Sequence, residues 1–168
     1  MKKYLTAAAA LCLVLALASF AAQDTINWKT LIKYLPETFN GMPQSEEPEG
    51  MTSSAGGYVV SEASASYGDD EDGEVSIIFG TMAGAQFEAL SQSAAVSYDS
   101  SDGYYRSTKI HGFPAVEQYD REDKSGTVMV MLPNKVIVTV TLDECEDTAI
   151  CLSVVESMDL NGLANEKE

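Results

Sequence analysis

The sequence is poor in basic residues, since 10 Lys and Arg face 26 Asp and Glu in 168 residues, which gives a net charge of −16. A chain this anionic repels the phosphate backbone, so we exclude nucleic acid as a partner. The length suits one domain, and no linker or internal repeat divides the chain.

Histidine occurs once, at His111, and cysteine three times. A zinc site needs several His or Cys ligands, and a catalytic triad would have to use His111 although no G-x-S-x-G segment is present. No glycine-rich loop precedes a helix in the manner of a phosphate site. We therefore interpret His111 as a strand-end residue beside the turn at Gly112 and assign no catalytic residue, metal ligand or cofactor.

Residues 1–21 have the pattern of a secretory signal peptide. The basic start Met1-Lys2-Lys3 precedes an apolar run from Leu5 to Phe20, and Ser19 and Ala21 are small residues at peptidase spacing. We expect cleavage between Ala21 and Ala22, a periplasmic or secreted protein, and no stable membrane insertion afterwards. The alternative is an uncleaved anchor, because the apolar stretch is just long enough to cross a bilayer.

Cleavage would remove Cys12 and leave Cys145 and Cys151, an even number that predicts a disulfide bond in an exported chain. Six residues of helix rise about 9 Å, which exceeds the roughly 7 Å that a disulfide allows between Cα atoms. Cys145 should therefore lie in the loop after a strand and Cys151 in the first turns of a helix. The acidic neighbours of Cys145 should raise its thiol pKa, which disfavours a redox role.

The hydrophobic pattern predicts an α+β fold, in which a mainly antiparallel sheet of five to six strands is covered by an N-terminal, a middle and a C-terminal helix. Trp28, Leu31, Ile32 and Leu35 form the apolar stripe of the first helix. Residues 22–57 comprise this helix and an irregular acidic connection, 58–160 form the α+β domain that shares its core, and 161–168 form a tail. The predicted strands are 58–67, 75–79, 104–110, 115–120, 127–132 and 136–142, with the last two central, and the later helices are 82–96 and 147–158.

The segment Lys109-Ile110-His111-Gly112-Phe113-Pro114-Ala115, followed by a Val-rich pair of strands, resembles the Gly-x-Pro-Ala corner of bacterial members of the PsbP-like superfamily. The order of elements over about residues 55–160 is also similar to that of this superfamily. The resemblance implies a binding or scaffold role more often than catalysis, and it carries no transferable site residues.

The acidic residues are unevenly distributed. From Tyr34 to Tyr105 the chain has no Lys, Arg or His in 72 residues but has 13 Asp and Glu. Such a region can attract a cationic ligand or a basic protein surface, or it can serve solubility alone. The acidic segment Asp69–Glu74 does not fit a calcium loop, because Gly68 and Phe79 occupy the positions that need acidic ligands.

These observations predict a small exported envelope protein of the binding or scaffold type, without enzymatic activity and with a basic protein or cationic ligand as its partner. The alternatives are a hydrolase that uses carboxylates and a structural protein that binds divalent cations weakly.

Overall fold

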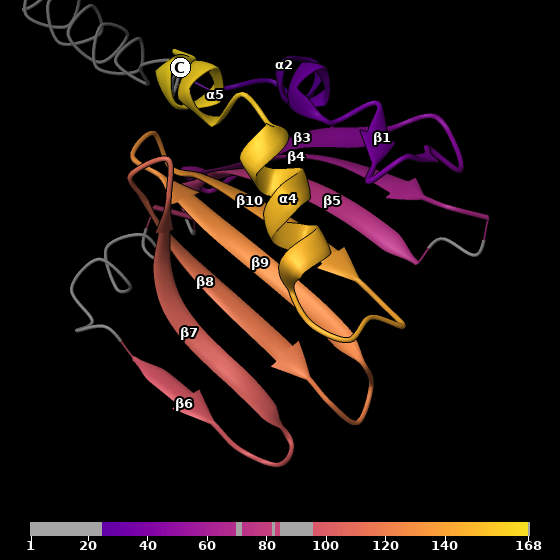
Figure 1. Ribbon diagram of the computed structural model, residues 1–168. Coiled ribbons are helices and arrows are strands. Elements are labelled where there is room, and N and C mark those ends of the chain that lie inside the picture. Colours follow the sequence, from indigo (N-terminus) through magenta and orange to yellow (C-terminus); the bar gives the residue numbers. More distant parts are fainter. Residues whose placement is uncertain (1–24, 70–71, 82, 85–95, 168) are drawn as a thin grey trace, which may run out of the picture.

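The computed structural model describes residues 25–69, 72–81, 83–84 and 96–167, with 50% strand and 19% helix. One antiparallel sheet of eight strands has the order β3-β4-β5-β10-β9-β8-β7-β6 (Figure 1). The strands are β3 Glu49–Ala55, β4 Tyr58–Tyr67, β5 Gly73–Gly80, β6 Ser97–Asp99, β7 Gly103–Ile110, β8 Phe113–Asp120, β9 Ser125–Leu132 and β10 Val136–Leu142. β9 and β10 are central, as their apolar sequences predict.

The prediction of a helix-covered sheet of five to six strands is wrong. The six predicted strands are present as β4, β5 and β7–β10, but β3 and β6 extend the sheet at its two ends. A second sheet of two strands, β1 Thr38–Phe39 and β2 Met42–Pro43, precedes β3. The connection that we predicted to be irregular therefore contains three strands, and the protein is mostly β.

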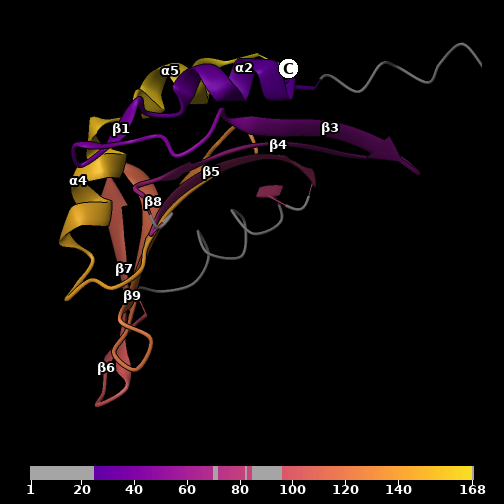
Figure 2. The ribbon, with the colours of Figure 1, turned by 90° about the vertical axis from the view of Figure 1, so that its right-hand side faces the viewer.

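Short helical segments lie on one side of the sheet (Figures 1 and 2). They are α2 Trp28–Leu31, the 3-10 turn η1 Ile32–Tyr34, α4 Ala149–Ser157 and α5 Leu160–Asn165. The predicted middle helix at 82–96 lies largely outside the described residues, as do the predicted signal peptide and its cleavage site at Ala21 and Ala22. α5 falls mostly within the segment that we expected to be a tail, and its Leu160 and Leu163 are fully buried.

Strict alternation along the strands produces the main core. Val128, Val130 and Leu132 of β9 point to the side that carries the helices, which we call the helix face, and they are fully buried. Val154 and Val155 of α4 cover them from above. The residues between them, Met129 and Met131, point to the opposite face, where Met131 joins a smaller cluster with Ala83, Val116 and Ile137.

A two-residue turn joins β3 to β4 at Gly56 and Gly57, whose φ angles are 59° and 84°. The Trp28 ring lies over Gly50 of β3, where a Cβ atom would come within 2.6 Å of it. Glycine at this position therefore allows α2 to pack closely against the first strand.

Candidate binding site

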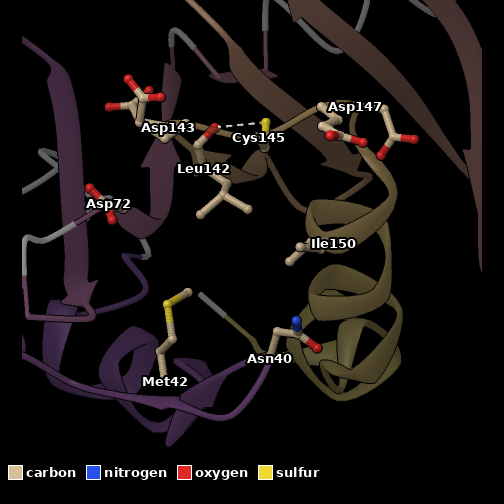
Figure 3. Close-up of a pocket in the computed structure, with 10 residues that line it drawn as sticks. Asn40, Met42, Asp72, Leu142, Asp143, Cys145, Asp147 and Ile150 are labelled. Atoms are coloured by element: carbon tan, nitrogen blue, oxygen red, sulfur yellow. Dashed lines mark hydrogen bonds between the residues drawn. The ribbon is translucent and has the colours of Figure 1, made fainter.

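A cavity of about 520 Å³ opens beside the end of the central strand β10. Five of its ten lining residues are Asp or Glu, and no described lining residue is Lys, Arg or His. Three apolar side chains, Met42, Leu142 and Ile150, point into the space, and the labelled acidic residues lie along its upper and left sides (Figure 3). We call it the acidic pocket; its lining is Asn40, Met42, Asp72, Leu142, Asp143, Glu144, Cys145, Glu146, Asp147 and Ile150.

Strand pairing brings together acidic residues that are distant in the sequence. β5 pairs with β10, so that Gly73 lies opposite Leu142, and the loops that precede and follow these residues meet at one end of the sheet. The amide of Asp143 donates a hydrogen bond of 2.9 Å to the carbonyl of Asp72. The sequence shows both acidic segments, but only the pairing of β5 with β10 shows that they form one rim.

Four of these acidic residues lie in the loop between β10 and α4, and hydrogen bonds to other segments hold this loop in place. The Cys145 amide donates to the Lys124 carbonyl at 2.9 Å, and the Tyr119 hydroxyl donates to the Cys145 carbonyl at 2.9 Å. Glu144 has a φ of 52°, in the left-handed region that non-glycine residues adopt at some energetic cost. The contacts at Cys145 hold this conformation, and the side chain of Glu144 reaches Lys124 at 3.7 Å.

Thr148 fastens the start of α4 to the sheet directly after the acidic loop. Its hydroxyl donates to Glu117 Oε2 at 3.0 Å and lies 2.8 Å from the Tyr104 hydroxyl, which also accepts from the Thr148 amide at 3.2 Å. Thr148 is almost completely buried. Asp147 accepts a hydrogen bond of 2.8 Å from the Ala149 amide at the same helix end. These contacts fix where the acidic loop meets α4.

The two cysteines occupy the elements that their spacing predicts. Cys145 lies in the loop after β10 and Cys151 in the first turn of α4, and both are buried free thiols. The Cys145 thiol donates to the Leu142 carbonyl at 3.2 Å, and the Cys151 thiol donates to the Gly126 carbonyl at 3.3 Å. The structure shows no bond between them, and the disulfide stays a prediction.

Burial, and to a smaller extent the neighbouring Cys145, raises the pKa of the Cys151 thiol to about 12. Burial is also the largest cause that raises the pKa of Cys145, and the nearby Asp147 and Asp143 act in the same direction. The expected effect of the acidic neighbours is therefore correct in sign, although burial is the stronger cause.

The other candidate residues do not form a second site in the described part of the chain. His111 is exposed in the turn between β7 and β8, as predicted, with a φ of 51°, and it does not line the acidic pocket. Asp70 and Glu71 of the acidic turn lie outside the described residues. Among those described, no group of three or more His, Cys, Asp or Glu residues is placed to hold a metal ion.

The helices described here are all too short or too polar to cross a membrane. No family model, curated protein or solved structure matches this chain. The resemblance to the PsbP-like superfamily therefore stays a prediction, and the function has to be argued from the pocket itself.

Proposed function

We propose that this protein is a non-enzymatic, exported envelope protein that binds a basic segment of a protein partner at the acidic pocket. The observation that supports the proposal is the lining of the pocket, which contains five acidic residues and three apolar side chains but no Lys, Arg or His among the described residues. The signal-like sequence of residues 1–21 supports export to the periplasm or the medium.

The lining suits the two parts of a Lys or Arg side chain. Such a side chain has an aliphatic stem, which can lie against Met42, Leu142 and Ile150, and a charged end that donates hydrogen bonds. Asp72 and Asp143 lie on the rim, where they can accept those bonds. The charged group would keep part of its hydration at this open rim, which reduces the desolvation cost of binding.

The anionic surface favours the encounter with such a partner. Asp72 belongs to the stretch from Tyr34 to Tyr105 that has no basic residue, and the chain as a whole carries a net charge of −16. A field of one sign raises the local concentration of oppositely charged partners and increases their association rate. We therefore expect binding to weaken as salt screens this field.

Binding can be measured by fluorescence anisotropy with a labelled Lys-Ala repeat peptide, using a Glu-Ala repeat as the negative control. Replacing both Asp72 and Asp143 by Asn should weaken binding of the Lys-Ala peptide about 3- to 10-fold, because each exposed ion pair contributes roughly 0.3–0.7 kcal/mol. Within the described residues no hydrogen bond to either carboxylate is observed, so these substitutions remove charge without breaking a contact of the fold.

The matched control is the double variant Glu37→Gln and Glu156→Gln, which removes two exposed charges away from the pocket. It should change the affinity less than twofold. Equal losses in the two double variants would show that net charge alone drives binding and would contradict the pocket proposal. If a polyamine displaces the peptide at an equal concentration, the ligand is a small organic cation instead of a protein segment.

A further inference from the structure

The dipeptide Asn-Gly occurs twice in the chain, at Asn40-Gly41 and at Asn161-Gly162. In this dipeptide the glycine amide nitrogen can attack the side-chain carbonyl carbon of the asparagine, because glycine has no Cβ atom to block the approach. The attack closes a succinimide ring and releases ammonia, and water then opens the ring to aspartate or isoaspartate. The net reaction consumes water, releases ammonia and replaces a neutral amide by a carboxylate.

Asn40 and Gly41 form the two-residue turn between β1 and β2. Their φ angles are 49° and 91°, and Phe39 pairs with Met42 across the turn. Both turn residues are exposed, and a Cβ atom at Gly41 would meet no other atom within 4 Å. Within the described residues no hydrogen bond to the Asn40 side chain is observed. The two groups that react are therefore neighbours on an open turn.

The ladder that closes this turn is short. β1 and β2 are joined by two pairs, Thr38 opposite Pro43 and Phe39 opposite Met42, and Pro43 has no amide to donate to the outer pair. A closed turn restrains the Gly41 nitrogen, but so short a pair of strands opens at a low cost in free energy. Opening lets the nitrogen reach the Asn40 side chain, while the fully buried Phe39 keeps β1 attached to the core.

Asn161 and Gly162 lie within α5, where the same reaction is blocked. The Gly162 amide donates a hydrogen bond of 2.8 Å to Asp159 Oδ1, at the start of the helix. The nitrogen must lose its proton in the attack, and the bond to a carboxylate keeps the proton in place. Leu160 and Leu163 are fully buried, so α5 must unfold locally before this nitrogen is released.

The position of Asn40 gives the reaction a consequence. Asn40 has the one amide side chain in the described lining of the acidic pocket, where five of the ten residues are already Asp or Glu. It lies beside Met42, across the space from Asp143 (Figure 3). A carboxylate at position 40 would extend the acidic lining to this side of the pocket.

We propose that Asn40 is a site of spontaneous deamidation, which converts a neutral residue of the acidic pocket into a sixth acidic one and strengthens the binding of a basic segment. Asn161 stays intact, because the nitrogen that would attack it is held by Asp159. The effect on binding rests on the proposed function, whereas the reaction itself depends only on the two Asn-Gly environments.

Peptide mapping of the folded protein, incubated at mildly alkaline pH, tests where the reaction occurs. Cleavage after glutamate releases residues 38–46 and 157–166 as separate peptides, each with one Asn-Gly. The first peptide should acquire the mass of the amide-to-acid change at least about tenfold faster than the second, because α5 must open before Asn161 can react. In urea the two peptides should convert at similar rates, which is the control for sequence alone.

Two outcomes of this experiment would overturn the proposed site. One is an equal rate for the two peptides in the folded protein. The other is an unchanged 38–46 peptide in the folded protein under conditions where both peptides convert in urea.

The variant Asn40→Asp tests the effect on the pocket, and aspartate tolerates the positive φ of this turn as asparagine does. It should bind the Lys-Ala peptide about two- to threefold more tightly than the wild type. The matched control, Asn161→Asp, adds the same charge in α5, away from the pocket, and should change the affinity less than about 1.5-fold.

Equal affinities for the two variants would overturn the effect of residue 40 on the pocket. A wild-type protein that does not bind the Lys-Ala peptide would refute the proposed function and, with it, this effect on binding. Peptide mapping would still decide whether Asn40 is the modified residue, so the two failures are distinguishable.

Discussion

The two faces of the sheet are built from the same strands but have different compositions. On β5, Ile77 is fully buried on the helix face, whereas the adjacent Ile78 is only partly buried on the opposite face. The central strand β10 shows the same contrast: Val138 and Val140 are fully buried, and the alternating residues Thr139 and Thr141 are partly buried. The opposite face ends in the stacked rings of Tyr98 and Tyr105, with Tyr98 57% exposed.

This difference teaches that the helix face supplies most of the stability, while the opposite face tolerates polar residues at partly buried positions. Fully buried apolar side chains contribute in proportion to the area that they remove from water. Partly buried Thr and Ser side chains contribute less and suit a pleated surface. Substitutions matched in type but located on opposite faces should therefore differ in their cost.

The largest contrast should come from alanine at adjacent positions of β5. Ile77→Ala creates a cavity in the main core and should lower the free energy of unfolding by about 2–5 kcal/mol. Ile78→Ala removes the same atoms from the opposite face and should cost less than about 1.5 kcal/mol, because the site is already in contact with solvent. Urea unfolding, followed by circular dichroism, measures both. An equal cost for the two variants would refute the contrast between the faces.

A smaller difference should appear when a threonine hydroxyl is removed. Thr148→Val removes the hydrogen bond to the partly buried Glu117 carboxylate and the hydroxyl contact of the buried Tyr104, and it should cost roughly 1–3 kcal/mol. Thr139→Val, on the opposite face, should be neutral or slightly stabilising, since valine suits a strand. Denaturant midpoints give both values. A destabilised Thr139→Val protein would indicate that its hydroxyl has a structural role that the contrast does not include.

The smallest effect concerns alkaline pH. Burial raises the pKa of Tyr67, on the helix face, to about 12, and its hydroxyl donates to the Pro36 carbonyl at 2.7 Å. Because the folded pKa exceeds the unfolded value near 10, the resulting stability is fully present below pH 10 and is lost as pH rises toward 12. Between pH 9 and 11 the loss should be about 1 kcal/mol.

Tyr67→Phe should reduce this pH dependence, although it also removes a hydrogen bond and lowers stability at neutral pH. Tyr105→Phe, on the opposite face, is the matched control, because it removes a tyrosine hydroxyl but leaves the hydrogen bond from Tyr67 to the Pro36 carbonyl in place. Tyr34, whose pKa burial also raises to about 12, should maintain part of the slope in both variants. Urea unfolding at several pH values measures how the free energy of unfolding of each variant changes with pH. Identical slopes for Tyr67→Phe and the wild type would contradict the prediction.

The regular alternation of apolar and polar residues makes the inner strands predictable. The edge strands β3 and β6 lack this alternation, so the sequence does not predict them. β4, β5 and β7–β10 follow apolar patterns that locate them to within a few residues. β3 was missed because its sequence, Glu49–Ala55, is rich in Gly, Ser and Thr and is mostly exposed, so that no apolar periodicity marks it. α5 was missed because the residues between Leu160 and Leu163 are Asn161 and Gly162, which are weak helix formers. Pairing with β4 and burial against the core determine these two elements.

The candidate site was only partly predictable. The sequence shows the acids near Asp72 and those between Asp143 and Asp147, and it predicts the loop and helix positions of Cys145 and Cys151. The convergence of the two acidic segments depends on the pairing of Gly73 with Leu142, which no local pattern encodes. Long-range strand pairing, in contrast to turns and helix ends, has no signal in a short window of sequence.

The pairing of β5 with β10 also limits the rate at which the chain can fold. The meanders β3–β5 and β6–β10 each form from strands that are neighbours in the sequence, but Phe79 must pair with Val136 across all the residues between them. Closing so long a loop costs entropy before any contact compensates for it, and sheets of high contact order fold on the scale of milliseconds to seconds. During that interval the inner edges of both halves are exposed, so folding must finish before those edges meet other chains.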